Sequence, residues 1–393
     1  MSRALPMLGA ILVSAPLSDL ACAHAQRSPS ASVTADVDST PVAMELLANV
    51  PFVRVLLNGR GPFLFMVDTG ATITALDKGL VAELGLTLER NSGGTGMRDA
   101  SAVALLPEGT VQIDEITVGK TRFKGIRAVV LALREPKALR RFSFAGVLGL
   151  NLFRGTTLIL DYPALALSVA LAPLAPADGR QIFRTFRADT GWIGVDVEVA
   201  GATRGFVLDS GAPEGIAMSL DMARRHRFQS EFKWVGQSLS AGNVVLEDKV
   251  ARLQGDAVLG RYVLHQPAVL LANQPGIGGA LLRQFKVTID LESERVELER
   301  AGDEPIPTNS WRVFGVKADY TGPRPLIVET HPGLPAATLL RAGDIVTKID
   351  GVDSSGVDGL FDGILQERDV LHLTIQRAGA IVIVDLPATR IPP

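Results

Sequence analysis

Short apolar runs separated by glycine-containing turns recur along most of the chain. In FVRVLLNGRGPFLFMV, residues 52–67, two such runs flank Asn58-Gly59-Arg60-Gly61. In GVDVEVAGATRGFVL, residues 194–208, two more flank Ala200-Gly201-Ala202-Thr203. Apolar runs of strand length on either side of such a turn are typical of β-hairpins. Both stretches are therefore predicted to be hairpins, and each leads directly into an aspartate.

The segments that follow the two predicted hairpins also resemble each other in order and pattern. Each hairpin precedes a short helical stretch, an apolar glycine-containing segment and a further pair of strands. The first copy has LDKGLVAELGL (76–86), GVLGLNLF (146–153) and LILDYPALALSV (158–169); the second has LDMARRHRF (220–228), GIGGALLRQF (276–285) and VTIDLESERVEL (287–298). The repeat predicts two β-rich lobes at about 46–173 and 183–300, joined by LAPLAPADGR at 171–180.

A third unit with a different pattern is predicted over 305–393, following the linker AGDEPIPTN at 301–309. Its short apolar runs predict strands. They are WRVFGVKAD, PLIVET, DIVTKIDG, VLHLTIQR and AIVIVDLP, with short helices at 335–340 and 357–367. A unit of this size can fold independently. The whole chain is thus predicted to be mainly β, with two pseudo-symmetric lobes and a small α+β domain.

The N-terminal segment has the order of a secretory signal: Arg3, an apolar run, then Ala23-His24-Ala25. We expect residues 1–25 to be a signal peptide, 26–45 to be a flexible segment, and the mature protein to be periplasmic or secreted. The apolar run is too short for a membrane helix, so no integral span is expected after cleavage. Lipoprotein anchoring at Cys22 is disfavoured, because Asp19 stands where that signal has a branched apolar residue.

The net charge, the cysteine count and the histidine pattern argue against several classes of function. The net charge of −3 over 393 residues gives no reason to expect binding to nucleic acid. Cys22 is the only cysteine, so cleavage of the signal would leave no thiol for catalysis and no disulfide. The sequence contains no HExxH motif and its histidines are scattered, so no metal site and no cofactor are predicted.

The aspartates at the ends of the two predicted hairpins are the candidate catalytic residues. FMVDTGAT contains Asp68 and FVLDSGAP contains Asp209, 209 − 68 = 141 residues later. Related lobes usually pack about a pseudo-two-fold axis, where equivalent residues face each other. Two carboxylates at such an axis share a proton, so one can deprotonate a water while the other polarises an amide carbonyl.

The residues that follow each aspartate are expected to support the pair. Thr69 and Ser210 offer hydroxyls that can bond across the lobe interface. Gly70 and Gly211 allow the backbone to approach the carboxylates and to donate N–H bonds to them.

These motifs resemble those of the aspartic proteases of the pepsin and retropepsin group, over most of residues 46–300. The resemblance implies β-barrel lobes, endopeptidase activity on protein or peptide substrates, and an apolar-apolar-Gly segment behind each aspartate loop. Val147-Leu148-Gly149 matches that segment in the first lobe, and Ile277-Gly278-Gly279 is aligned with it in the second. The second lobe departs from the family pattern at Gly278, where an apolar residue is usual, and at Pro213, which replaces a less rigid residue after the aspartate motif. The resemblance also implies a flap hairpin at about 93–110, with Gly93, Gly94, Thr95 and Gly96 as candidates.

The third unit resembles the PDZ domains of bacterial envelope proteases, through ETHPGLPAATLLRAGDIVTKIDG at 329–351. PDZ domains bind a peptide as an added strand. The resemblance implies a peptide-binding loop at Val313-Phe314-Gly315-Val316, with Phe314, Gly315 and Val316 as the binding residues.

The sequence also has features of two other classes of protein. Asn91-Ser92-Gly93-Gly94 resembles the nucleophile segment of trypsin-like enzymes, but no histidine lies between residue 26 and Ser92 to act as the preceding base. The alternative that remains is a catalytically inactive, two-lobed peptide-binding protein of the cell envelope. Asp161 and Asp290 precede turns, and a structural role is expected for both.

Overall fold

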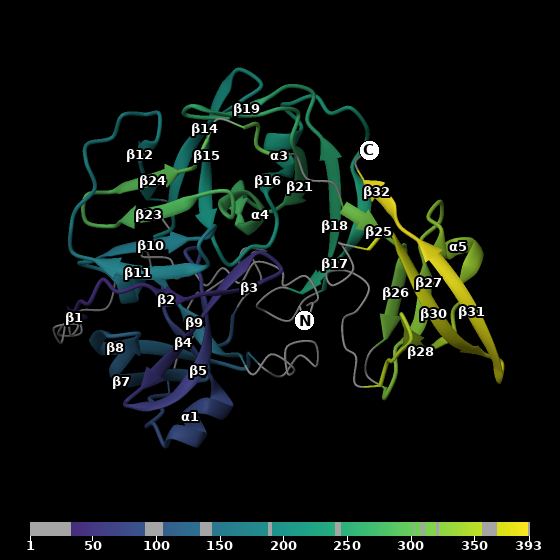
Figure 1. Cartoon of the computed structure of the whole chain (residues 1–393), viewed down its shortest axis with the longest axis horizontal. Helices are drawn as coiled ribbons and strands as arrows, with labels where there is room; N and C mark the ends of the chain where they lie inside the picture. Colours follow the sequence, from purple (N-terminus) through teal and green to yellow (C-terminus); the bar gives the residue numbers. More distant parts are fainter. Residues whose placement is uncertain are drawn as a thin grey trace.

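The computed structural model describes residues 33–90, 105–133, 144–187, 191–239, 245–302, 304–307, 311–319, 322–355 and 368–391. Two β lobes share a sheet between them, and a third β unit lies beside the second lobe (Figure 1). The chain is mainly β, as the sequence predicts.

The first lobe is built on the predicted hairpin, which forms β4 (Val50–Leu57) and β5 (Arg60–Val67). Asn58 and Gly59 have φ angles of 48° and 74°, the left-handed pair that matches the twist of a tight hairpin. Among the described residues, eight strands form this sheet, in the order β1-β8-β6-β9-β5-β4-β3 with β7 beside β4 and β8. The remaining elements are β1 (Thr34–Asp36), β3 (Glu45–Leu47), β6 (Ala75–Asp77), α1 (Lys78–Leu84), β7 (Gly109–Val118), β8 (Thr121–Leu131), β9 (Phe144–Leu148) and η2 (Leu150–Phe153).

The second lobe repeats this plan on β14 (Ile193–Val199) and β15 (Ala202–Asp209). Its turn residues Ala200 and Gly201 also have positive φ angles, 47° and 83°. Ten strands of the described chain form its sheet, in the order β17-β18-β21-β16-β22-β15-β14-β19-β20 with β13 beside β14. The remaining elements are β13 (Phe186–Arg187), β16 (Ile216–Ser219), α3 (Leu220–Ala223), β17 (Lys233–Leu239), β18 (Val245–Arg252), β19 (Ala257–Leu259), β20 (Tyr262–Leu264), β21 (Ala268–Ala272), β22 (Gly276–Gly278) and α4 (Gly279–Leu282).

Strand pairing shows that the two lobes have the same topology. The aspartate-bearing strands β5 and β15 run parallel to β9 and β22, respectively. β6 pairs antiparallel with β9 and parallel with β8, while β16 pairs antiparallel with β22 and parallel with β21. The sequence repeat is therefore a repeat of structure.

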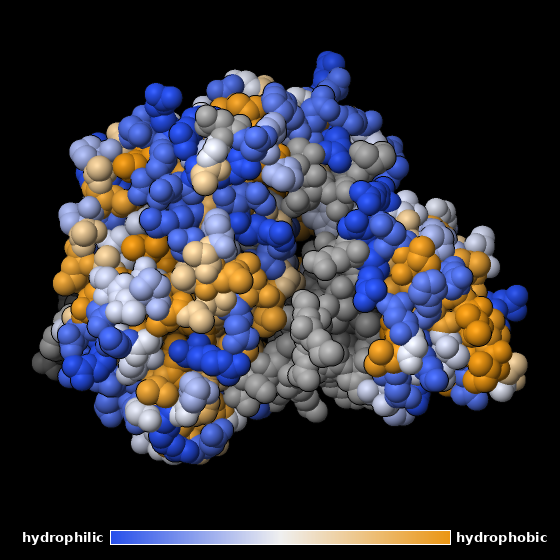
Figure 2. Space-filling view, in the orientation of Figure 1, coloured by the Kyte–Doolittle hydropathy of each residue, from blue (hydrophilic) through white to orange (hydrophobic). Residues whose placement is uncertain are grey.

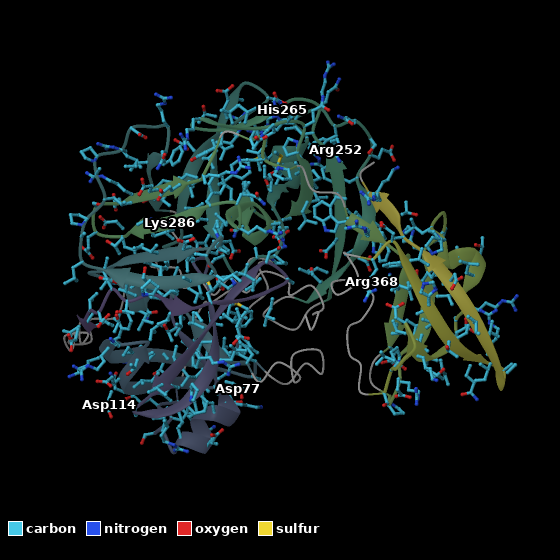
Figure 3. All side chains as sticks on the ribbon, in the orientation of Figure 1. Asp77, Asp114, Arg252, His265, Lys286 and Arg368 are labelled. Carbon is cyan, nitrogen blue, oxygen red and sulfur yellow. The ribbon has the colours of Figure 1, made fainter. Side chains whose placement is uncertain are left out.

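A sheet in the order β12-β24-β23-β10-β11-β2 connects the lobes. Its two central strands are antiparallel partners from different lobes, with Thr157 opposite Asp290 and Asp161 opposite Lys286, which Figure 3 labels. The strands are β2 (Val42–Ala43), β10 (Thr157–Asp161), β11 (Ala166–Ala170), β12 (Ile182–Arg184), β23 (Lys286–Asp290) and β24 (Arg295–Glu299). One apolar core runs through both lobes and this sheet.

The C-terminal unit consists of a two-stranded and a six-stranded sheet in the described chain. Its elements are β25 (Trp311–Val313), β26 (Val316–Asp319), β27 (Leu326–Thr330), α5 (Ala336–Leu339), β28 (Ile345–Ile349), β29 (Val352–Asp353), β30 (Val370–Arg377), β31 (Ala380–Pro387) and β32 (Thr389–Ile391). The buried carboxylate of Asp344 accepts two bonds from Arg377, at 2.8 and 2.7 Å, which fixes the loop before β28 against β30. Apolar side chains gather on the outer side of this unit, where Ile381 and Ile383 of β31 are exposed (Figure 2).

Two expectations differ from the structure. The segment 26–45 was predicted to be flexible, but its part 34–43 contains β1 and β2, which pair with β8 and β11. The helix predicted over 220–228 ends at Ala223, after one turn. The predicted signal peptide at 1–25 and the helix at 357–367 lie outside the described residues. No helix of the described chain is long and apolar enough to cross a membrane.

Candidate active site

Asp68 and Asp209 occupy equivalent loops at the ends of β5 and β15, and both are almost fully buried. One carboxylate oxygen of Asp68 accepts bonds from the N–H groups of Gly70 and Ala71, at 2.8 and 3.1 Å. The Asp209 carboxylate is held in the same way by Gly211 and Ala212, at 2.9 and 3.1 Å. Each loop therefore fixes its own carboxylate through the backbone N–H groups of the two residues that lie two and three positions after the aspartate.

The hydroxyls of Thr69 and Ser210 lock the two loops together. The Thr69 Oγ1 donates to the Leu208 carbonyl at 2.8 Å and accepts from the Ser210 N–H at 2.9 Å. The Ser210 Oγ donates to the Val67 carbonyl at 2.8 Å and accepts from the Thr69 N–H at 2.9 Å. These four buried bonds are reciprocal, so they relate the lobes by the pseudo-two-fold axis that the sequence predicted.

Gly211 brings the second loop into contact with the carboxyl group of the first. A Cβ atom built on Gly211 would lie 2.5 Å from Asp68 Cγ and 2.6 Å from each carboxylate oxygen. Contact this close is available only to a glycine, which explains the residue type at this position. Because Gly211 is also bonded to Asp209, the two carboxyl groups are brought to one place.

The two aspartates interact with each other, and both have a raised pKa. Burial is the main cause that raises the pKa of Asp68, and its carboxyl is close enough to Asp209 for a hydrogen bond between them. Burial, followed by the charge of Asp68, raises the pKa of Asp209 well above its usual range. Asp68 Oδ2 accepts no bond from a donor in the described chain. Since a bond between two carboxyl groups needs a proton on one of them, the pair holds a proton under conditions where separate aspartates would be ionised.

The segments behind the aspartate loops correct the predicted alignment of the second lobe by one residue. Val67 pairs with Leu148 in the first lobe, and Leu208 pairs with Ile277 in the second. Leu150 N–H donates to the Ala71 carbonyl, as Gly279 N–H donates to that of Ala212. The counterpart of Val147-Leu148-Gly149 is therefore Gly276-Ile277-Gly278, and the alignment with Ile277-Gly278-Gly279 was wrong.

In the corrected alignment Gly278 corresponds to Gly149. It therefore occupies the glycine position of the apolar-apolar-Gly segment and is not a departure from that pattern. A Cβ atom there would lie 2.4 Å from the Glu214 carbonyl oxygen and 2.8 Å from that of Ala212. Gly149 is equally confined in its own lobe, because a Cβ atom built on it would lie 2.5 Å from the Ile73 carbonyl carbon. Glycine is required at both positions, because each loop backbone passes directly over it.

The first lobe supports the loop at Pro213, the other departure from the family pattern. The Asn49 side-chain amide donates to the Pro213 carbonyl at 3.0 Å, and Arg283 donates to the Asn49 side-chain oxygen at 2.8 Å. The contact holds the second aspartate loop from across the interface.

Two further carboxyl groups were not singled out from the sequence: Glu214, which interacts with Asp209, and Asp248, which interacts with Glu214. Burial, followed by the charge of Asp209, raises the pKa of Glu214 to about 8. Burial raises the pKa of Asp248, on β18, to about 7; its Oδ1 accepts from the Ser238 hydroxyl at 2.9 Å, and its Oδ2 has no partner in the described chain. Glu214 follows the DSGAP motif, which could have drawn attention to it. Asp248 lacks any such sequence signal, because its burial depends on tertiary packing.

The other predicted residues lie away from the pair or outside the described chain. Gly93, Gly94, Thr95 and Gly96 are in the undescribed stretch 91–104, and the Ser92 segment lies there too. Phe314, Gly315 and Val316 are in the C-terminal unit, where both apolar side chains are buried in its core and Gly315 has a φ of 79°.

Asp161 and Asp290 have the structural role that was expected. Asp161 accepts from the Ala164 N–H at 3.0 Å. Asp290 accepts from the N–H groups of Glu292 and Ser293, at 3.1 and 3.0 Å. Both carboxylates cap the turns of their hairpins.

Comparisons with known proteins bear on the first lobe. Residues 53–152 match the family model described as aspartyl protease, and the match includes Asp68 and Gly149. Among solved structures, the chain is similar to a retropepsin-like aspartic protease from Rickettsia conorii. The identity is 22% and the TM-score 0.22, over 31% of this chain and 86% of that one. No curated protein matches.

Proposed function

We propose that the protein is an aspartic endopeptidase that hydrolyses peptide bonds with a water activated by Asp68 and Asp209. The observation that carries the proposal is the reciprocal set of bonds between Thr69 and Ser210, which brings two buried carboxyl groups together. The family match of the first lobe supports the same reaction class.

The chemistry follows from one proton held by two carboxyl groups. The ionised carboxylate removes a proton from water as the water oxygen attacks the carbonyl carbon of the substrate, and the protonated carboxyl donates to the carbonyl oxygen. The resulting tetrahedral adduct then breaks its C–N bond, and the amide nitrogen receives a proton from the pair. One water is consumed, and a carboxyl and an amine are released.

Replacing either aspartate with asparagine tests this mechanism. Asparagine keeps nearly the same shape but cannot exchange the proton, so Asp68→Asn and Asp209→Asn should each lower kcat on fluorescein-labelled casein by roughly 10²–10⁴-fold. Asp114→Asn, at an exposed aspartate of β7, is the matched control. Undiminished cleavage by both site variants would show that the pair does not perform the reaction. Casein binding without cleavage by the unaltered protein would instead favour an inactive peptide-binding protein.

The proposal extends to the C-terminal unit and to cellular location. We infer that the unit is a PDZ domain that binds peptides along β26, which ends the six-stranded sheet in the described chain. Titration with peptides of varied C-terminal sequence tests this role. We also propose that the protein is exported to the periplasm or beyond, because the first 25 residues have the order of a signal peptide. Mass spectrometry of the N-terminus of the mature protein tests that step.

A further inference from the structure

The hairpin of β17 and β18 is the second-lobe counterpart of the flap predicted in the first lobe. Adding the repeat spacing of 141 to 93–110 gives 234–251, which falls within the hairpin formed by Lys233–Leu239 and Val245–Arg252. Strand pairing supports the equivalence, since β18 pairs antiparallel with β21 in the second lobe as β7 pairs antiparallel with β8 in the first. The hairpin therefore corresponds to the segment of the first lobe in which the family resemblance predicts a flap.

The same hairpin is connected to the Asp209 loop. β18 pairs with β21, and β21 pairs with β16, the strand that follows this loop. Asp248 of β18 acts electrostatically on Glu214, which in turn is affected by the charge of Asp209. A displacement of the hairpin would thus be transmitted through β21 and β16 to the Asp209 loop.

The C-terminal unit holds both strands of the hairpin. The Trp234 ring of β17 stacks on the imidazole of His331, with centroids 4.7 Å apart and planes 11° from parallel. On β18, Glu247 forms an ion pair with Lys317 of β26 at 3.0 Å. Figure 1 shows β17 and β18 on the side of the second lobe that faces β25 and β26.

An apolar cluster beneath these contacts makes the attachment more than a surface ion pair. Trp234, Val235 and Val250 of the hairpin pack in one buried cluster with residues of the C-terminal unit, namely Trp311, Val313, Leu334 and Ile391. Exposed ion pairs contribute little to stability, whereas buried aromatic side chains contribute most to an interface. The ring of Trp234 is therefore the main anchor.

The predicted peptide-binding loop is connected to this anchor through the cluster residue Val313 and through His331. His331 N–H donates to the Gly315 carbonyl at 2.8 Å. A Cβ atom on Gly315 would lie 2.5 Å from Leu334 Cβ, so the loop packs tightly against the same cluster. Contacts therefore run from the C-terminal unit to the hairpin: Gly315 is hydrogen-bonded to His331, whose ring stacks on Trp234.

We propose that the C-terminal unit holds the β17–β18 hairpin in the position that substrate binding requires, with His331 and Trp234 as positioning residues. The inference rests on the proposed peptidase function. Neither residue touches the reacting atoms, so their replacement should alter substrate binding more than the chemical step.

His331→Ala, His331→Phe and His372→Ala test the proposal in the full chain. Alanine removes the stacked ring, phenylalanine keeps one, and His372 is an exposed histidine of β30 that pairs with Asp385 instead. The loss of a stacked pair corresponds to about a three- to tenfold change in an equilibrium. We expect His331→Ala to speed amide hydrogen exchange in 233–239 and 245–252 by that factor. It should raise KM for fluorescein-labelled casein similarly, with a smaller change in kcat.

His331→Phe should restore both values, and His372→Ala should change neither. Unchanged exchange in the hairpin, or faster exchange with unchanged KM, would overturn the proposal. If the unaltered protein cleaves nothing, the proposed function fails, and the dissociation constant for casein replaces KM as the measurement. An affinity that His331→Ala does not weaken, or the absence of casein binding, then overturns this inference as well.

Discussion

The surroundings of the Asp68 and Asp209 carboxylates are formed by residues two and three positions further along the chain and, for Asp68, by one glycine of the opposite lobe. The N–H groups that follow each aspartate fix one oxygen of the carboxylate. Burial raises the pKa of both aspartates, and the charge of Asp68 raises that of Asp209 further. The sequence predicted these roles because Asp-Thr-Gly and Asp-Ser-Gly occur at matching places in a repeat. The distance between the loops depends on tertiary contacts such as that of Gly211, which no local pattern encodes.

Removing the Thr69 hydroxyl should destabilise the protein. Thr69→Ala leaves the buried Leu208 carbonyl and Ser210 N–H without their cross-lobe partner, which costs about 1–3 kcal/mol for each group. Thr69→Ser keeps the hydroxyl and should cost only about 1 kcal/mol for the lost methyl. Urea unfolding measures both. Equal stabilities for the two variants would show that the bonds do not couple the loops.

Adding one methyl group at Gly211 should abolish cleavage. A Cβ atom there would displace the Asp68 carboxyl, whereas a Cβ atom on Gly276, one strand away, has its nearest contact at 3.8 Å. We expect Gly211→Ala to lower kcat by about 10²-fold or more, as misplacement of about 1 Å does, and Gly276→Ala to keep activity. Casein cleavage by folded protein provides the comparison, and an active Gly211→Ala enzyme contradicts the geometry.

The pH dependence of cleavage should follow the shared proton. Because burial raises both pKa values, the pair keeps its last proton at pH values where separate aspartates have lost theirs. The rate should therefore be maintained above pH 4 and fall once the pair is fully ionised. A profile of kcat/KM measures this fall. A flat profile from about pH 4 to 9 is incompatible with a pair that must hold one proton.

At the scale of the element, strands and hairpins were well predicted, and alignment between the lobes was not. Alternating apolar residues and the turns at Asn58-Gly59 and Ala200-Gly201 determine the hairpins locally. By contrast, the glycine-rich GIGGA at 276–280 offers two alignments with VLGL, and only strand pairing distinguishes them. The flap predicted in the first lobe also had a counterpart that the repeat spacing alone could have located in β17 and β18.

Asp248 should make the stability of the hairpin depend on pH. Its pKa is raised from 3.8 to about 7, so the folded protein holds this proton more tightly than the unfolded chain does. The stabilisation is present below about pH 4 and is lost as pH rises through 7, by roughly 4 kcal/mol. Urea unfolding between pH 4 and 8 should show a smaller loss in Asp248→Asn. The exposed Asp114→Asn change serves as control, and an unaltered slope in Asp248→Asn would exclude a buried titrating carboxyl.

At the scale of the whole molecule, the shared sheet makes the two lobes one folding unit. β10 and β23 come from different lobes yet are adjacent partners, and one apolar core runs beneath both. The sequence predicted two lobes with a linker, but pairing between hairpins of different lobes involves distant residues and has no sequence signature. This is the part of the architecture that only the structure provides.

Hydrogen exchange should reveal this unity. Since β10 and β23 cannot separate without exposing the common core, their amides should exchange with the same free energy as those of β5 and β15. Mass spectrometry of peptides from all four strands, over a series of low urea concentrations, measures the four values. Markedly earlier exchange in β10 and β23 would mean that the lobes open independently.

The attachment of β17 and β18 to the C-terminal unit also has a consequence for reading a substrate. A polypeptide has chemical polarity, and a site made of two identical halves presents the same surroundings to both of its directions. Here one half carries the additional unit, which contacts Trp234 and Glu247, and the halves also differ at equivalent positions such as Thr72 and Pro213. The two halves of the site therefore differ, and a peptide bound between them would meet different surroundings in its two directions.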